Sequence, residues 1–201
     1  MRAPSVAAGL LACLLAAPLT AADTDHSLAA TQAAGRSVAL LARCCFLADD
    51  FVTPRPDVNG GAVDVLATFF LARTTQFATC DASVVALSRL VSSAYGQLAS
   101  DDCALGLAQN FCDNVRVQSL DAATRQSALA VLAFLVNTRP KACAAAGVKF
   151  LQGFVQATDG EQDPQNVLTV FKLNHALCRA VEPGVLAFHL EDMFDVLSTY
   201  F

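Results

Sequence analysis

The sequence DAATRQSALAVLAFLVNTRPKACAAAGVKFLQGFVQAT, residues 121–158, decides the fold. Residues 128–136 within it form an unbroken apolar run. A helix that is apolar on every side must be enclosed by other helices or by lipid. A membrane span needs about 20 apolar residues, so this run is too short to cross a bilayer. We therefore expect it to form the buried centre of an all-helical domain.

Pro140 divides this stretch into two helices, at residues 121–138 and 140–158. Proline has no N–H to donate inside a helix, but it fits the first helical turn. Capping and turn residues predict six further helices of similar length, with Asp81 and Asp163 as two of the N-caps. These helices cover residues 27–48, 62–79, 82–98, 101–117, 164–181 and 184–200.

The short loops between the predicted helices force neighbouring helices to run antiparallel. Two architectures satisfy this requirement. One is a closed helical bundle. The other is an open stack of helical hairpins, with a repeat of about 40 residues that is close to the armadillo and HEAT period. The sequence therefore predicts an all-α fold of about eight antiparallel helices and leaves these two architectures open.

The first 22 residues have the pattern of a secretory signal peptide. Arg2 gives a positive start, residues 6–17 are apolar, and Ala21 and Ala22 are small residues that suit a cleavage site. We therefore expect a signal peptide at residues 1–22, a single all-helical domain at residues 23–201, and a secreted, extracellular protein.

A secreted chain is expected to form disulfides, because its cysteines meet an oxidising compartment. If the helices alternate in direction, Cys143 begins one helix and Cys178 ends the next, so both lie at the same end of the domain. Cys143–Cys178 is the first expected disulfide. The same geometry makes Cys80–Cys112 the second, and these bonds would stabilise the fold.

The remaining cysteines give a third expected disulfide and one odd thiol. Cys103 is expected to pair with Cys45 or Cys44, which are sequence neighbours and point in different directions. We take Cys44 as the odd cysteine. An odd thiol stays free or links two chains, so a disulfide-linked homodimer is one expected form of the protein.

Residues 49–61, DDFVTPRPDVNGG, form the one long connection. Two prolines and an Asn-Gly-Gly sequence are typical of a loop, and long ordered loops often carry recognition residues. We expect this loop to contact a partner. The candidate contact residues are Asp49, Asp50, Phe51, Arg55, Asp57 and Asn59.

The sequence shows no catalytic signature. His175 and Cys178 are three residues apart on one predicted helix, but a catalytic thiol also needs exposure and an orienting group. His189 with Asp192 lacks a second set of metal ligands. Residues 159–163 lack the features of a calcium loop and read as an acidic turn that ends in an N-cap. We predict no enzyme activity, no metal and no cofactor.

Charge and composition leave two binding functions. The formal net charge of −5 argues against nucleic-acid partners. The first hypothesis is a secreted protein that binds another protein. The alternative is an extracellular carrier of a lipid or other apolar small ligand, since thirteen phenylalanines could line a cavity between helices.

The last predicted helix has an apolar stripe at helical spacing, and we expect this stripe to face the core. Acidic residues lie mostly on the other side of the helix. The expected buried residues are Leu186, Leu190, Met193, Leu197 and Phe201.

Overall fold

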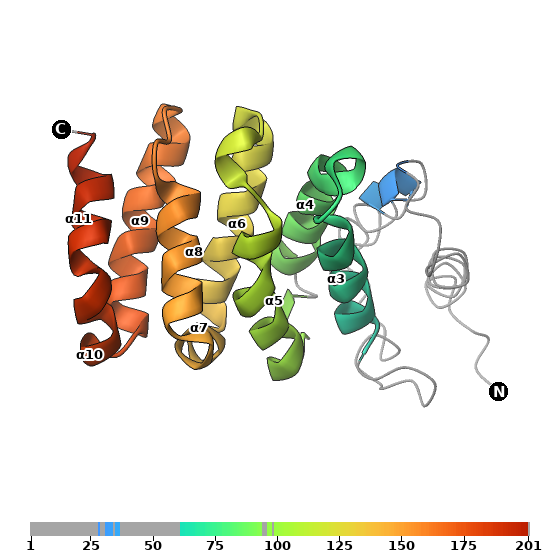
Figure 1. The fold of residues 1–201 in the computed structure, drawn as a ribbon. Helices are drawn as coiled ribbons and strands as arrows, with labels where there is room; N and C mark the ends of the chain where they lie inside the picture. Colours follow the sequence, from blue (N-terminus) through green and yellow to red (C-terminus); the bar gives the residue numbers. More distant parts are fainter. Residues whose placement is uncertain are drawn as a thin grey trace. The chain divides into compact units, whose positions relative to one another are not determined.

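The structure is a computed structural model, and it describes residues 28, 31–33, 35–36, 61–93, 96–97 and 99–200. The regular secondary structure of these residues is helical, without a strand among them (Figure 1). This confirms the all-α prediction. The chain divides into two compact units, Met1–Ser100 and Asp101–Phe201. The predicted boundary between residues 22 and 23 lies outside the described residues.

Unit 1 contains a helical hairpin made of α3 (Ala62–Arg73) and α4 (Phe77–Ser92). Threonine hydroxyls satisfy the carbonyls at the end of α3. Thr74 Oγ1 donates to the carbonyl of Leu71 at 2.6 Å, and Thr79 Oγ1 donates to that of Arg73 at 2.7 Å.

These threonine hydrogen bonds explain one error in the predicted boundaries. The helix predicted to reach residue 79 ends at Arg73, because the side chains of the turn take over its last carbonyls. The next helix begins at Phe77, so Cys80 and Asp81 lie in its first turns. The prediction that Asp81 is an N-cap is therefore wrong.

Unit 2 contains a longer series of helices. They are α5 (Asp101–Asn114), α6 (Ala122–Thr138), α7 (Pro140–Ala146), α8 (Val148–Thr158), α9 (Pro164–Ala180), α10 (Pro183–Leu186) and α11 (Leu190–Ser198), with 3-10 turns at Val117–Ser119 and Ala187–His189.

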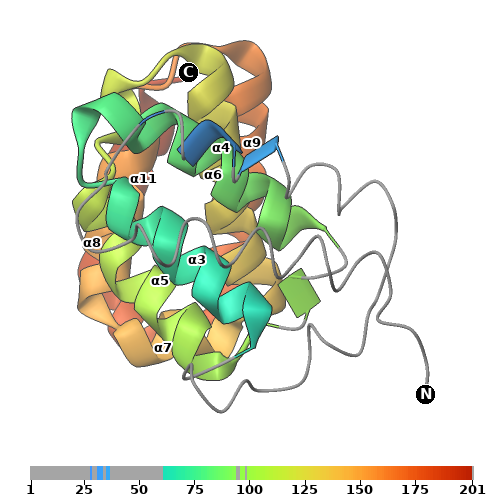
Figure 2. The same cartoon turned by 90° about the vertical axis from the view of Figure 1, so that its right-hand side faces the viewer.

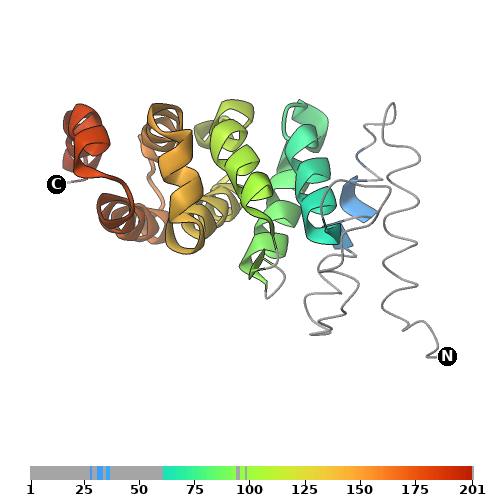
Figure 3. The ribbon, with the colours of Figure 1, turned by 90° about the horizontal axis from the view of Figure 1, so that it is seen from below.

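The helices of unit 2 are arranged in two layers. α5 packs against α8 and α8 against α11, while α6 packs against α9. Figures 2 and 3 show α5, α8 and α11 on one side and α6 and α9 on the other. This arrangement is consistent with a HEAT-like stack of helical hairpins, the open form of the two predicted architectures.

The quoted stretch at residues 121–158 folds largely as expected. α6 ends at Thr138 and α7 begins at Pro140, with an angle of 99° between them. Gly147, at φ 60°, then separates α7 from α8, a break that the sequence analysis did not predict. Most of the apolar run at residues 128–136 is buried.

None of the described helices is by itself long and apolar enough to cross a membrane. α6 and α7 have enough length and apolar character only when they are counted as one bent pair.

Phenylalanine rings fill the cores of both units. The side chains of Phe111, Phe150 and Phe154 in unit 2 and of Phe70 in unit 1 are completely buried. The rings of Phe150 and Phe154 have their centroids 6.1 Å apart. These rings are packing groups, so they do not line the ligand cavity that the carrier hypothesis required.

The acidic turn before α9 contains a buried ion pair. The Glu161 side chain is 1% exposed and receives two hydrogen bonds of 2.8 Å from the Arg125 guanidinium. It also accepts from the backbone N–H groups of Gln162 and Asp163, each at 3.0 Å. Asp163 is the N-cap of α9, as predicted. The turn therefore joins α6 to the start of α9.

The C-terminal segment buries only part of the predicted stripe, and Leu197 within it is half-buried. Leu186 and Met193 are buried, but Leu190 is 48% exposed and Phe194 68% exposed. The 3-10 turn at Ala187–His189 has fewer residues per turn than an α-helix, so it changes the phase of the stripe. Val196 is buried in place of Leu190, while Phe201 lies outside the described residues.

Gly153 allows close approach of α8 to α5, because a Cβ atom there would collide with the Cβ of Cys112. We expect Gly153→Ala to lower the free energy of unfolding by about 1–3 kcal/mol. Gly106 in α5 has open space around it, so Gly106→Ala is expected to be neutral or to stabilise by up to about 1 kcal/mol. Urea denaturation followed by circular dichroism measures both. Equal effects of the two substitutions would contradict this packing.

Candidate interaction surfaces

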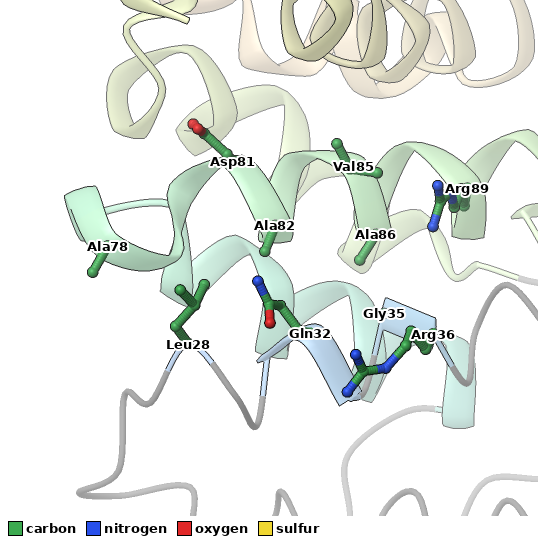
Figure 4. Close-up of a pocket in the computed structure, with 10 residues that line it drawn as sticks. All are labelled: Leu28, Gln32, Gly35, Arg36, Ala78, Asp81, Ala82, Val85, Ala86 and Arg89. Atoms are coloured by element: carbon green, nitrogen blue, oxygen red, sulfur yellow. The ribbon is translucent and has the colours of Figure 1, made fainter. Parts of the chain in front are cut away.

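An open groove runs along one face of α4 in unit 1 (Figure 4). Its volume is about 530 Å³. One wall consists of residues that recur at helical spacing on α4, and the other comes from the helical residues between 28 and 36. The lining residues are Leu28, Gln32, Gly35, Arg36, Ala78, Asp81, Ala82, Val85, Ala86 and Arg89.

Small residues bring the two walls of the groove together. A Cβ atom placed on Gly35 would lie 3.1 Å from the Cβ of Ala86. In Figure 4 the Gln32 side chain points toward Ala82, which lies in the middle of the α4 wall. The two walls of the groove therefore meet at Gly35 and Ala86, which are both buried.

The two ends of the groove differ in chemistry. Figure 4 shows Leu28 and Ala78 at one end, and the guanidinium groups of Arg36 and Arg89 toward the other. Leu28, Arg36, Ala78 and Arg89 are exposed. The groove therefore offers an apolar contact and two cationic hydrogen-bond donors to a partner. The repeating alanines of α4 are the sequence signal that could have indicated it.

Two further hollows lie in unit 2. One, of about 520 Å³, lies between the start of α5 and the turn from α6 to α7. Its Arg139 and Asp101 form an ion pair of 3.3 Å with each other. The other, of about 460 Å³, is lined by Cys112 and Gly153. Cys112 lies beside Asp113 in the second hollow, but burial raises the pKa of its thiol to about 12, so it is not an activated nucleophile.

The two described histidines, His175 and His189, do not form a catalytic or metal site. His175 and Cys178 are both exposed on α9. His189 is buried, and its Nδ1 lies 3.4 Å from Asp192 Oδ2. In the part of the chain that the structure describes, no three His, Cys, Asp or Glu side chains gather as metal ligands.

The predicted disulfides among the described cysteines do not form. Cys80, Cys112, Cys143 and Cys178 are free thiols, so Cys143–Cys178 and Cys80–Cys112 are wrong. Cys143 is buried while Cys178 is exposed. Cys44 and Cys45 lie outside the described residues. The expected bond from Cys103 to one of them, and the expected homodimer through Cys44, therefore stay predictions.

Burial makes the core thiols unreactive. It raises the pKa of Cys143 to about 12. Burial, with the nearby charge of Asp113, also raises the pKa of Cys112 to about 12. Such thiols stay protonated at neutral pH and are poor nucleophiles and metal ligands.

Thiol labelling should therefore separate exposed from buried cysteines. We expect N-ethylmaleimide to modify Cys178 in the folded protein long before Cys143, because the Cys143 thiolate is scarce and enclosed. Peptide mass spectrometry of timed samples measures both rates. A sample unfolded in urea is the control, in which both must react. Equal rates in the folded protein would contradict the buried position of Cys143.

The predicted recognition loop lies outside the described residues. This applies to all six of its candidate contact residues, so their role stays a prediction. They are Asp49, Asp50, Phe51, Arg55, Asp57 and Asn59.

Layered helical hairpins define this chain as a helical-repeat protein. The comparison with protein families agrees. A family model of the MMS19 N-terminal region, described as "Dos2-interacting transcription regulator of RNA-Pol-II", matches residues 28–201. The chain belongs to this MMS19 family.

Curated relatives carry the same family name. The chain is 34% identical over 87 residues to the human MMS19 nucleotide excision repair protein homolog, which is 43% of this chain and 8% of the human protein. It is 29% identical over 147 residues to the Arabidopsis thaliana homolog, which is 72% of this chain and 13% of that protein. The chain thus spans a small part of these relatives. No solved structure matches it.

Family membership corrects the predicted location. The family is described as a transcription regulator of RNA polymerase II, which acts inside the cell, so the prediction of a secreted, extracellular protein is wrong. The secreted binding protein and the extracellular carrier are both overturned with it. Residues 1–22 lie outside the described part of the chain, so the structure does not test the cleavage site. The family consists of non-enzymatic scaffolds that bind proteins, which confirms the prediction of no enzyme activity.

Proposed function

We propose that this chain is a segment of a HEAT-like scaffold that holds protein partners inside the cell. The groove on α4 is the observation that supports a binding role most directly. Its two walls come from different helices, its residues are largely exposed, and its volume of about 530 Å³ is that of a binding site. A scaffold needs such surfaces and no reacting groups.

The groove suits a helix from a partner protein. Ala78 is exposed and Ala82 half-buried on the α4 wall, so a second helix can approach this part of α4 closely, as small residues allow at other helix interfaces. Leu28 supplies an apolar contact at one end. Arg36 and Arg89 can donate to carboxylates or carbonyls of the partner at the other end.

The family description suggests one partner to test. It names interaction with Dos2 and regulation of transcription by RNA polymerase II. The relatives are named for nucleotide excision repair. We propose that a Dos2 protein binds the α4 groove, and that the bound scaffold serves transcription or DNA repair.

Biolayer interferometry with purified Dos2 tests this function. The intact chain is expected to bind in a saturable way. Ala78→Arg places a long, charged side chain in the apolar end of the groove and should weaken binding about tenfold or more, roughly 1.4 kcal/mol. Ala78 is exposed, so the substitution is expected to leave the fold intact.

Ala144→Arg is the matched control. Ala144 is also an exposed helical alanine, but it lies on α7 and outside the groove. It should leave the affinity for Dos2 unchanged. Absence of binding by the intact chain, or equal weakening by both substitutions, would overturn the proposed contact.

A further inference from the structure

Some helices of unit 2 carry charge of one sign only. The sequence of α9 contains Lys172 and Arg179 and no acidic residue. On the other side, α5 and α11 each carry three acids and no lysine or arginine, while α8 between them carries Lys149. These acids are Asp101, Asp102, Asp113, Glu191, Asp192 and Asp195. Lys172 and Arg179 thus place positive charge on α9 in a chain whose formal net charge is −5.

The basic residues of α9 share its exposed face. Lys172, His175 and Arg179 are exposed and lie at the spacing that places side chains on one side of a helix. Leu168, which is 55% exposed, precedes them by one turn on the same side. The ion pairs of the described residues involve neither Lys172 nor Arg179. We call these four side chains, Leu168, Lys172, His175 and Arg179, the α9 row.

We infer that the α9 row is a docking surface for an acidic amphipathic helix of a partner protein. The row extends over about 16 Å, or three helical turns. A partner helix with carboxylates at every third or fourth position would meet Lys172 and Arg179, and an apolar residue beside them would cover Leu168. The row shares no residue with the α4 groove, so this inference stands or falls separately from the binding of Dos2.

Charge complementarity favours a protein helix over nucleic acid. Nucleic-acid binding depends on neutralising many phosphates, and the α9 row offers only two permanent cations beside an exposed leucine. Two well-placed cations are enough to steer and orient an acidic helix. The acids of α5 and α11 would repel the same partner, which favours docking on α9.

Fluorescence anisotropy tests this surface with a defined probe. The probe is a fluorescein-labelled peptide of about 16 residues that forms a helix with glutamates on one face and leucines beside them. The intact chain should bind this peptide. The affinity should fall as sodium chloride is added, because salt screens the attraction between the charges. The double substitution Lys172→Glu with Arg179→Glu should weaken binding about tenfold or more.

The control reverses two cations elsewhere in the same unit. Arg116→Glu with Lys141→Glu makes the same change in net charge away from α9 and should alter binding less than about twofold. Leu168→Ser tests the apolar contact without changing charge and should also weaken binding. Circular dichroism confirms that each variant is folded.

Three results would overturn the inference. The intact chain could fail to bind the peptide, or both double substitutions could weaken binding equally, which would indicate net charge alone. Double-stranded DNA could also displace the peptide more effectively than an unlabelled acidic peptide does. That third result would assign the α9 row to nucleic acid.

Discussion

Replacing Glu161 by alanine is expected to lower the free energy of unfolding by about 3–5 kcal/mol. The side chain is 1% exposed and pairs with Arg125 through two hydrogen bonds of 2.8 Å. Alanine would leave the guanidinium without its partner. It would also remove the acceptor for the N–H groups of Gln162 and Asp163. Urea denaturation of both proteins measures the difference.

Asp113→Ala provides the comparison. Asp113 pairs with Lys149 at 2.9 Å, but both side chains are 51% exposed. Water screens such a pair, so its loss should cost less than about 1 kcal/mol. If Glu161→Ala were no more costly than Asp113→Ala, the ion pair at Glu161 would not be the buried link between α6 and α9.

The Glu161 carboxylate also makes the stability of the folded chain depend on pH. Burial opposes ionisation of Glu161, but hydrogen bonds from Arg125 and from the backbone of Asp163 and Gln162 outweigh it and hold the pKa below its ordinary value. The unfolded chain therefore takes up a proton at a higher pH than the folded chain does. The stabilisation is present above the ordinary glutamate pKa and is lost as the pH falls through the folded pKa. Glu161→Ala should lose less stability on acidification than the intact chain.

Phe154→Ala is expected to have an effect of similar size, about 3–5 kcal/mol. The Phe154 ring is completely buried between helices of unit 2 and lies beside that of Phe150. Alanine would remove most of this buried surface and leave a cavity that the close-packed helices cannot fill. Thermal and urea unfolding followed by circular dichroism measure the loss.

Phe194→Ala is the matched control, since it makes the same substitution on α11. The Phe194 side chain is 68% exposed, so its removal should change stability by about 0.5 kcal/mol or less. A loss as large as that for Phe154→Ala would show that the exposed face of α11 is covered in solution. It would also contradict the buried stripe described for that helix.

The sequence predicted the helices well because local signals determine them. Pro140 can only end one helix and begin another, and Asp163 before Pro164 has the chemistry of an N-cap. The apolar run at residues 128–136 had to be buried, and most of it is. Gly147 was not predicted as a break, because a glycine inside a helical pattern is often tolerated.

Long-range features could not be predicted in this way. Glu161 lies in a polar turn, and its pairing with Arg125 depends on how α6 and α9 pack. The α4 groove needs a second wall from a segment that is distant in sequence. The disulfides were predicted because the chain was expected to be secreted. The spacing of the cysteines could not correct that expectation, and membership of the family did.

Hydrogen exchange of the chain with and without Dos2 tests the scaffold function most directly, because it locates the contact without any substitution. Slower exchange over α4 on addition of Dos2, with little change in α5 and α8, is the result that the proposed contact predicts. Exchange rates over α4 that stay the same while Dos2 is in excess would contradict a scaffold that holds this partner in the α4 groove.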